Sequence, residues 1–118
     1  MSTSGSDKGL EELRNQLRAF AQERDWDQFH SPKNLAIALS VEAAELLEHF
    51  QWSSGKESDQ VQIEEVKREI GDVLLYLIRL ADKLGIDPVE AAHSKIKENA
   101  KKYPVEKARG SSKKYTKL

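Results

Sequence analysis

Apolar residues along the chain recur at helical spacing and are separated by short polar breaks. From 8 to 24 they fall at steps of three and four, while the other positions are mainly charged. Ser31 followed by Pro32 is a strong start signal for a second helix, because serine caps free amides and proline fits the first helical position. This helix is expected to continue to about Gln51. The pattern therefore predicts two helices in the first part of the chain.

A third, longer helix is expected to follow. Asp59 and Gln62 resemble a capping box, and the helical pattern continues to about Leu84. The section 73–81 is apolar on almost every side, which is typical of a helix surrounded by other elements. Few other helices are available to surround it, so we infer that a second subunit packs against it. Gly71 costs about 1 kcal/mol relative to alanine inside a helix, and the close approach of another backbone would explain it.

Asp87 and Pro88 supply a cap and a first-turn proline for a fourth helix, which ends near Tyr103. The predicted fold class is all-α. We expect a four-helix bundle-type protomer that assembles into a homo-oligomer through its long third helix. Residues 1–7 are expected to form a disordered lead, 8–104 the helical domain, and 105–118 a basic tail that is either mobile or ordered over another group.

Composition narrows the class of protein. A net charge of -1 over 118 residues argues against a broadly basic nucleic-acid surface and against attraction to membranes. The absence of cysteine excludes disulfides and thiolate metal sites, which leaves oxygen and imidazole as ligands. No apolar run approaches the roughly 18 residues of a membrane span, and the N-terminus lacks the pattern of a signal peptide. We therefore expect a soluble, cytoplasmic protein without nucleic-acid or membrane partners.

Two pairs of acids are the candidate chemistry. Glu42 and Glu45 lie three residues apart on the second expected helix, as Glu69 and Asp72 do on the third, and apolar residues flank both pairs. One such pair usually faces water. Two pairs in apolar stretches can converge in a core, where unneutralised carboxylates would repel one another and lose their hydration. A hard cation, Mg²⁺ or Mn²⁺, would neutralise them, and Mg²⁺ commonly bridges to substrate phosphates.

Other interpretations compete with a magnesium site. Glu90 and His93 match the E-x-x-H element of di-iron bundles, but those proteins need it twice and Glu90 also fits a capping box. Trp26 and Trp52 in loops, together with lysines on the fourth helix, instead suggest a nucleotide whose phosphates bind through the metal. Hydrolysis, with water attacking a phosphorus in line with the leaving group, needs the fewest further groups. A non-catalytic oligomeric helical module that senses a nucleotide or binds a partner helix is the alternative.

Several segments together resemble the MazG-like all-α nucleotide pyrophosphohydrolases, and in particular their dCTP pyrophosphatase branch. Besides the two acid pairs, the segments that carry this resemblance are 24–30 (RDWDQFH), 50–52 (FQW), 72–77 (DVLLYL), 95–99 (KIKEN), 109–111 (RGS) and 114–116 (KYT). The resemblance implies hydrolysis of a nucleoside triphosphate, foremost dCTP or modified dCTP, to the monophosphate and pyrophosphate in nucleotide-pool housecleaning. It also implies a homotetramer built as a dimer of dimers, with substrate sites near the subunit contacts. A dUTPase-like preference within the same all-α group is an alternative.

The resemblance further implies roles for single residues. The metal ligands would be Glu42, Glu45, Glu69 and Asp72, and either Glu42 or Glu45 would orient or deprotonate the attacking water. The implied substrate-binding residues are Trp26, Trp52 and Tyr76 for the base and sugar, Lys95 and Asn99 from the fourth helix, and His30 as a pocket neighbour. The chain departs at Leu17, where animal members have a histidine that helps to hold the nucleotide. The resemblance therefore supports the reaction more strongly than it supports one base.

Overall fold

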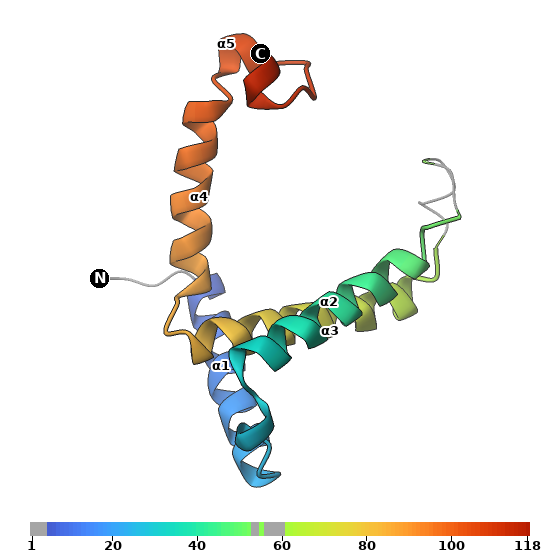
Figure 1. Cartoon of the computed structure of the whole chain (residues 1–118), viewed down its shortest axis with the longest axis vertical. Helices are drawn as coiled ribbons and strands as arrows, with labels where there is room; N and C mark the ends of the chain where they lie inside the picture. The colour runs from blue at the N-terminus through green and yellow to red at the C-terminus, as the bar shows by residue number, and fades with distance from the viewer. Residues whose placement is uncertain (1–4, 53–54, 56–60) are drawn as a thin grey trace. The chain divides into compact units, whose positions relative to one another are not determined.

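Figure 1 shows a computed structural model of the chain, in which residues 5–52, 55 and 61–118 are described. The elements are helical: α1 (Gly5–Glu23), η1 (Asp27–Phe29), α2 (Pro32–Glu48), α3 (Ile63–Lys83), α4 (Pro88–Lys102), α5 (Val105–Ala108) and η3 (Tyr115–Lys117). These described residues contain no strand, which confirms the predicted all-α class. The chain divides into two compact units, Met1–Ile86 and Asp87–Leu118.

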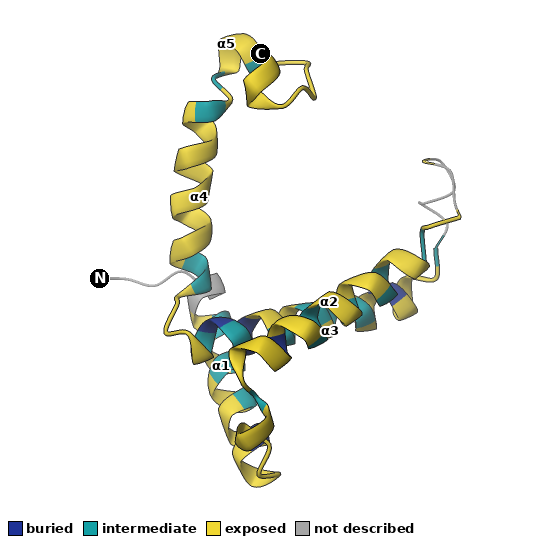
Figure 2. Cartoon of the chain, viewed as in Figure 1, coloured by how far each residue is buried: buried dark blue, intermediate teal, exposed yellow. Residues whose placement is uncertain are grey.

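The first unit is built on the pairing of α2 with α3, and α1 packs against α3. α2 and α3 run side by side in opposite directions (Figure 1). Buried residues lie where these helices meet (Figure 2). The buried apolar side chains are Ala21, Leu35, Val66, Ile78 and Ala81. Leu35 is the only large one among them that is completely buried, so the described part of this unit has a small core.

Local signals set the helix ends much as the sequence predicts. The Ser31 side chain caps α2 by accepting a hydrogen bond from the Asn34 amide at 3.1 Å. Gly85, with a φ of 68°, follows the last turn of α3. The Gly85 amide donates to the Asp82 carbonyl at 3.2 Å, and the Ile86 amide donates to the Ala81 carbonyl at 2.9 Å. This paired arrangement is a Schellman motif, which needs a residue in the left-handed conformation and so favours glycine.

Other boundaries differ from the predictions. α3 begins at Ile63 and has 21 residues, fewer than expected, and its cap residue Gln62 makes no side-chain cap hydrogen bond. The predicted capping residue Asp59 lies outside the described residues. A Cβ atom built on Gly71 would meet no other atom within 4 Å. Within the described part of the chain, therefore, the expected close approach of another backbone to Gly71 does not occur.

The first two helices also have ends that differ from the expected ones. α1 begins at Gly5, within the expected lead 1–7, of which residues 1–4 lie outside the described residues. α2 ends at Glu48 rather than near Gln51. None of the described helices combines the length and the hydropathy that a membrane span requires.

The second unit consists of α4, α5 and η3. The Asp87 carboxylate caps α4 by accepting hydrogen bonds from the Val89 and Glu90 amides at 2.9 and 3.2 Å. The expected tail 105–118 contains helical turns and returns to the end of α4. There the Tyr115 ring lies edge to face with the Tyr103 ring, at a centroid distance of 6.0 Å, and the Lys102 amine lies 5.0 Å from the Tyr115 ring centroid.

Candidate metal and nucleotide site

The pairing of α2 with α3 brings acids from both helices together. Glu42, Glu69 and Asp72 each offer a carboxylate oxygen, and these three oxygens lie within 4.8 Å of one another. Glu69 and Asp72 can face Glu42 together because residues three apart share one side of a helix. Among the described residues this is the only group of three or more acids or histidines that could hold a metal ion. The cluster joins one member of the first predicted pair to both members of the second.

The cluster holds carboxylate oxygens that lack the partners a buried polar atom needs. Glu42 Oε2 and Glu69 Oε2 are both buried without a hydrogen-bond partner. Burial, as the largest cause, and the neighbouring acids Glu45, Asp72 and Glu69 together raise the pKa of Glu42 to about 7. Crowded carboxylates of this kind are stabilised by a cation, and an all-oxygen donor set suits a hard divalent ion. The residues therefore fit a divalent metal site.

Glu45 lies beside this cluster rather than within it. It is half-buried on α2, and it contributes to the raised pKa of Glu42. Its oxygens are not among the three that approach within 4.8 Å. The structure therefore brings together three of the four acids as one potential ligand set, and the fourth borders that set.

The aromatic candidates of the first unit lie on different elements. Tyr76 is half-buried on α3, four residues beyond Asp72 and thus one turn further on the same side. Trp52 follows the end of α2 and its surface is 89% exposed. An indole exposed to this degree has its ring face available for stacking.

Trp26 and His30 flank the short turn η1. The Trp26 ring packs edge to face against Phe20, at a centroid distance of 5.6 Å, and against His30, at 6.3 Å. His30 Nδ1 accepts a hydrogen bond from Arg79 Nε at 3.2 Å. Partial burial lowers the pKa of His30, and the positive charge of Arg79 lowers it further. The hydrogen bond from Arg79 ties the position of the His30 ring to α3.

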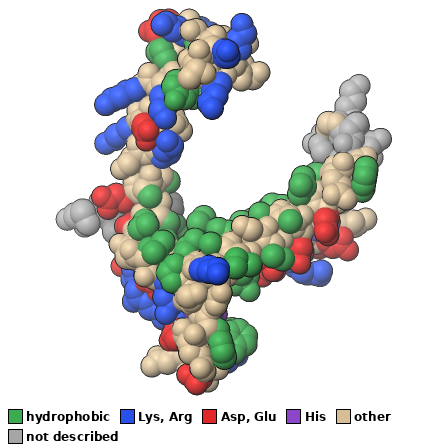
Figure 3. All heavy atoms as spheres, in the orientation of Figure 1, with side chains coloured by type: hydrophobic (Ala, Val, Ile, Leu, Met, Phe, Trp, Pro, Cys, Tyr) green, Lys and Arg blue, Asp and Glu red, His purple; other side chains and the backbone are tan. Residues whose placement is uncertain are grey.

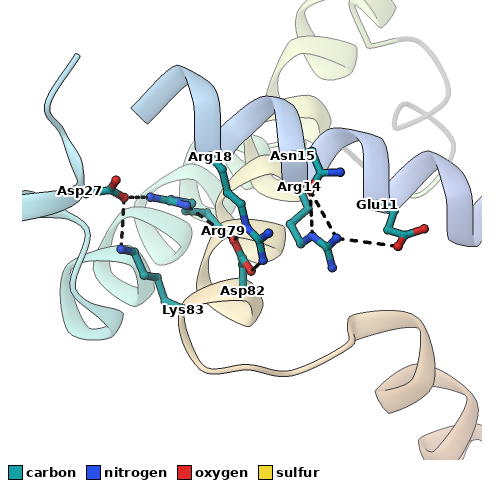
Figure 4. A network of polar contacts seen from close by, with 8 residues as sticks. All are labelled: Glu11, Arg14, Asn15, Arg18, Asp27, Arg79, Asp82 and Lys83. Atoms are coloured by element: carbon teal, nitrogen blue, oxygen red, sulfur yellow. Dashed lines mark hydrogen bonds and ion pairs between the residues drawn. The ribbon is translucent and has the colours of Figure 1, made fainter. Parts of the chain in front are cut away.

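Arg79 was not among the predicted site residues. It belongs to a network of polar contacts, which Figure 4 shows. It donates a hydrogen bond to the Asp27 carboxylate, and its guanidinium lies 3.6 Å from Asp82. Asp82 also accepts a hydrogen bond from Arg18 Nε at 2.7 Å, and Lys83 donates to Asp27 at 3.2 Å. The network connects α1 and η1 to the last turns of α3. Its signal in the sequence is an arginine inside the apolar section 73–81.

The remaining candidates lie on α4, in the second unit. Lys95 and Asn99 are exposed, and Lys95 forms an ion pair with Glu98 at 3.2 Å. Glu90 and His93 are also exposed. They form no metal-binding group with any third described acid or histidine, so the structure gives no support to the di-iron interpretation.

Comparison with known proteins identifies the family to which this chain belongs. The MazG-like family matches residues 37–118, and the chain is a member of that family. Among its relatives is dCTP pyrophosphatase 1 of Rattus norvegicus, 44% identical over 114 residues that cover 92% of this chain and 67% of that protein. The human dCTP pyrophosphatase 1 is 42% identical over 114 residues, with the same coverage.

A solved structure agrees with these sequence relatives. A pyrophosphatase from Archaeoglobus fulgidus DSM 4304 superposes with a TM-score of 0.79 at 47% sequence identity, covering 81% of this chain and 93% of that one. These comparisons confirm the predicted family and support the prediction of a pyrophosphohydrolase.

Proposed function

We propose that this chain hydrolyses dCTP, or a modified form of dCTP, to the monophosphate and pyrophosphate in a Mg²⁺-dependent reaction. The observation that carries the proposal is the cluster of Glu42, Glu69 and Asp72, with two buried and unpartnered oxygens, in a chain of the MazG-like family. Its relatives named dCTP pyrophosphatase 1 support the choice of substrate. Housecleaning of the cytoplasmic nucleotide pool is the role we propose for this activity.

The four acids divide the work of the reaction. Glu42, Glu69 and Asp72 would hold Mg²⁺, or Mn²⁺ in its place, with Glu45 next to them. When bound, the divalent cation would supply positive charge to the phosphates and increase the acidity of nearby water. Glu45 borders the three-acid cluster, so it is the carboxylate that can orient the attacking water and accept its proton. Glu42 is the alternative base if Glu45 completes the ligand set instead.

Aromatic and basic side chains would bind the rest of the nucleotide. Trp26, Trp52 and Tyr76 are proposed to contact the base and sugar, with His30 as a neighbour; a base stacked on an aromatic ring gains about 1–3 kcal/mol. The proposed contacts from α4 are Lys95 and Asn99. Leu17 is half-buried on α1, and an apolar side chain there offers no hydrogen bond. The preference for cytosine over other bases therefore depends on these side chains and on Leu17, and not on the acid cluster.

Assembly is part of the proposed function. We propose a homotetramer, built as a dimer of dimers, with the active sites near the subunit contacts. Within its described residues the first unit holds the α-helices α1, α2 and α3, and a second copy would complete a four-helix arrangement around α3. A second copy could also supply the backbone that is expected beside Gly71.

The decisive experiment measures pyrophosphate release from a panel of deoxynucleoside triphosphates with Mg²⁺ and with a chelator. We expect dCTP or a modified cytosine nucleotide to be hydrolysed only with the metal. Glu45→Gln removes a charge with little change in volume and should reduce kcat by about a hundredfold or more, the usual size of a general-base contribution. Glu48→Gln, an exposed position on the same helix, is the matched control and should keep the wild-type rate.

Two results would contradict the proposal. Wild-type protein that releases no pyrophosphate from any triphosphate would favour the nucleotide sensor. A Glu45→Gln variant with the wild-type rate and the normal Mg²⁺ dependence would remove Glu45 from the catalytic residues.

A further inference from the structure

We infer that Arg79 is a positioning residue, which holds the turn from Trp26 to His30 against α3 and thereby presents the Trp26 ring to the nucleotide base. The first part, that Arg79 holds the turn, rests on contacts within the chain. The second part, the effect on nucleotide binding, rests on the proposed function, in which Trp26 contacts the base.

Arg79 lies in a buried position, where a charged side chain is unfavourable unless it has partners. Its surface is only 5% exposed, and it is the only polar or charged residue that is buried among those the structure describes. A buried guanidinium must satisfy its donors with hydrogen bonds, because an unpaired buried charge is strongly unfavourable. Two of its donors bind the turn directly: Nε donates to His30 Nδ1 at 3.2 Å, and the other donates to the Asp27 carboxylate.

The turn itself has few apolar anchors. Residues 22–29 are all exposed, and Asp25 adopts a left-handed backbone conformation with a φ of 53°. Within the turn, the Phe29 amide donates to the Trp26 carbonyl at 2.9 Å, and the His30 amide donates to the Asp27 carbonyl at 3.2 Å. At its two ends, the Trp26 amide donates to the Ala21 carbonyl of α1 at 2.8 Å, and the Asn34 side chain of α2 donates to the Phe29 carbonyl at 2.9 Å. These bonds shape the turn locally. Its polar connections to α3 come from Arg79 and, through Asp27, from the more exposed Lys83.

The hydrogen bond from Arg79 also determines the state of the His30 ring. Because Nδ1 accepts this bond, the proton of the neutral imidazole lies on Nε2. The bond fixes the orientation of the ring as well, and the ring lies edge to face with Trp26 at a centroid distance of 6.3 Å. Arg79 therefore acts on the Trp26 ring through His30.

The ion pair between Arg18 and Asp82 lies next to Arg79 and provides the control for the Arg79 variants. Arg18 on α1 donates to Asp82, which also lies 3.6 Å from Arg79. Arg18 has no hydrogen bond to any residue of the turn among the contacts of the described residues. Removing Arg18 should disturb the same network in Figure 4 without releasing the turn.

The test compares Arg79→Met, Arg79→Lys and Arg18→Met in the full chain. The first readout is the tautomer of His30, measured by long-range ¹H–¹⁵N correlation NMR, with the His30 signals assigned by means of His30→Gln. Wild-type protein and Arg18→Met should show the Nε2–H form. Arg79→Met should show a mixture of tautomers. Arg79→Lys should also lose the defined tautomer, because a single ammonium cannot reproduce the two directed bonds of the guanidinium.

The second readout is the kinetics of dCTP hydrolysis. Arg79→Met should raise KM about tenfold and change kcat less than about twofold, as expected for a loss of binding shared by the ground state and the transition state. Arg79→Lys should give an intermediate KM because its ion pair with Asp27 survives. Arg18→Met should keep the wild-type KM. Asp27→Ala removes the more exposed partner of Arg79 and should also raise KM. Arg79 keeps its ion pair with Asp82 at 3.6 Å, so this variant keeps the test valid if Arg79→Met does not fold.

An unchanged His30 tautomer in Arg79→Met would overturn the inference, as would an unchanged KM in both Arg79→Met and Asp27→Ala. If Arg79→Met and Arg18→Met raised KM equally, the role of Arg79 would be general stability rather than positioning. Wild-type protein that hydrolysed no triphosphate would refute the proposed function alone, because the NMR comparison would still decide whether Arg79 holds the turn.

Discussion

At the scale of single residues, Glu42 is the group whose pKa the fold shifts most among the described residues. Burial raises its pKa from 4.5 to about 7, with Glu45 as the next contributor. Between these two pH values the folded chain binds more protons at Glu42 than the unfolded chain does. Each rise in pH through this window therefore favours unfolding, so the contribution is fully present below about pH 4.5 and is lost as the pH rises through about 7.

This sign gives a measurable pH dependence. With metal removed by a chelator, Glu42→Gln should flatten the pH dependence of Tm between pH 5 and pH 8, roughly the window of the linkage. The variant should be more stable than wild type by several degrees at the upper end. Added Mg²⁺ should stabilise wild type at high pH more than it stabilises Glu42→Gln, because a ligand stabilises the folded state to which it binds.

The exposed Glu48→Gln variant serves as the control and should keep the wild-type pH profile. The comparison between variants is necessary because Asp82 has a lowered pKa, chiefly from its hydrogen bond with Arg18, and this acts on stability in the opposite sense at lower pH. Parallel Tm profiles for wild type and Glu42→Gln would show that Glu42 is not the titrating group.

The sequence was informative about the acids and uninformative about Arg79 for one physical reason. The spacing of Glu69 and Asp72 fixes their common side of a helix, so their convergence with Glu42 required only that α2 and α3 pair. Arg79 depends on Asp27, which is 52 positions away in the sequence, and no local pattern specifies that contact. A buried arginine requires a partner, and the sequence does not specify which residue that partner is.

At the scale of secondary-structure elements, helix ends were predictable where a short-range hydrogen bond determines them. The Ser31 cap of α2, the Asp87 cap of α4 and the Gly85 end of α3 all depend on residues within one turn. The start of α3 was predicted too early: the helix begins at Ile63, and its cap residue Gln62 makes no side-chain cap hydrogen bond.

The cap of α2 can be tested by Ser31→Ala. Loss of the hydrogen bond from the Asn34 amide should lower the free energy of unfolding by about 1 kcal/mol, which corresponds to a decrease in Tm of about 4–8 °C for a domain of this size. Ser40→Ala is the matched control on the same helix. The Ser40 hydroxyl donates only to the Ala36 carbonyl, an acceptor already within the helix, so its loss should change Tm little.

Thermal unfolding followed by circular dichroism measures both serine variants. Equal Tm values for Ser31→Ala and Ser40→Ala would mean that the observed cap does not stabilise α2.

At the scale of the whole molecule, the first unit exposes more apolar surface than a chain with so small a core would be expected to leave in water. Apolar side chains gather over α2 and α3 on the face shown in Figure 3. On α3 the exposed apolar residues are Ile63, Ile70, Leu74 and Leu77, spaced by seven, four and three residues. This spacing forms one stripe along a helix, of the kind that packs against another helix. Periodicity alone predicted this need for a partner, whereas the identity of the partner depends on surfaces that no local pattern describes.

The proposed homotetramer makes this stripe a subunit contact, and Leu74→Glu tests it. Leu74 is 38% exposed. It lies three residues from Gly71, where a Cβ atom would meet no other atom within 4 Å. A charge placed at position 74 would be buried without a partner in the assembly, which is strongly unfavourable.

Size-exclusion chromatography with light scattering should show a tetramer for wild type and a smaller species for Leu74→Glu. Hydrolysis of dCTP should fall together with the tetramer, because the proposed sites lie near the subunit contacts. Lys67→Glu, an exposed charge change on the same helix, should leave both the mass and the rate unchanged. A wild-type monomer with full activity would refute the proposed assembly, and it would leave the stripe on α3 to be explained by a different partner.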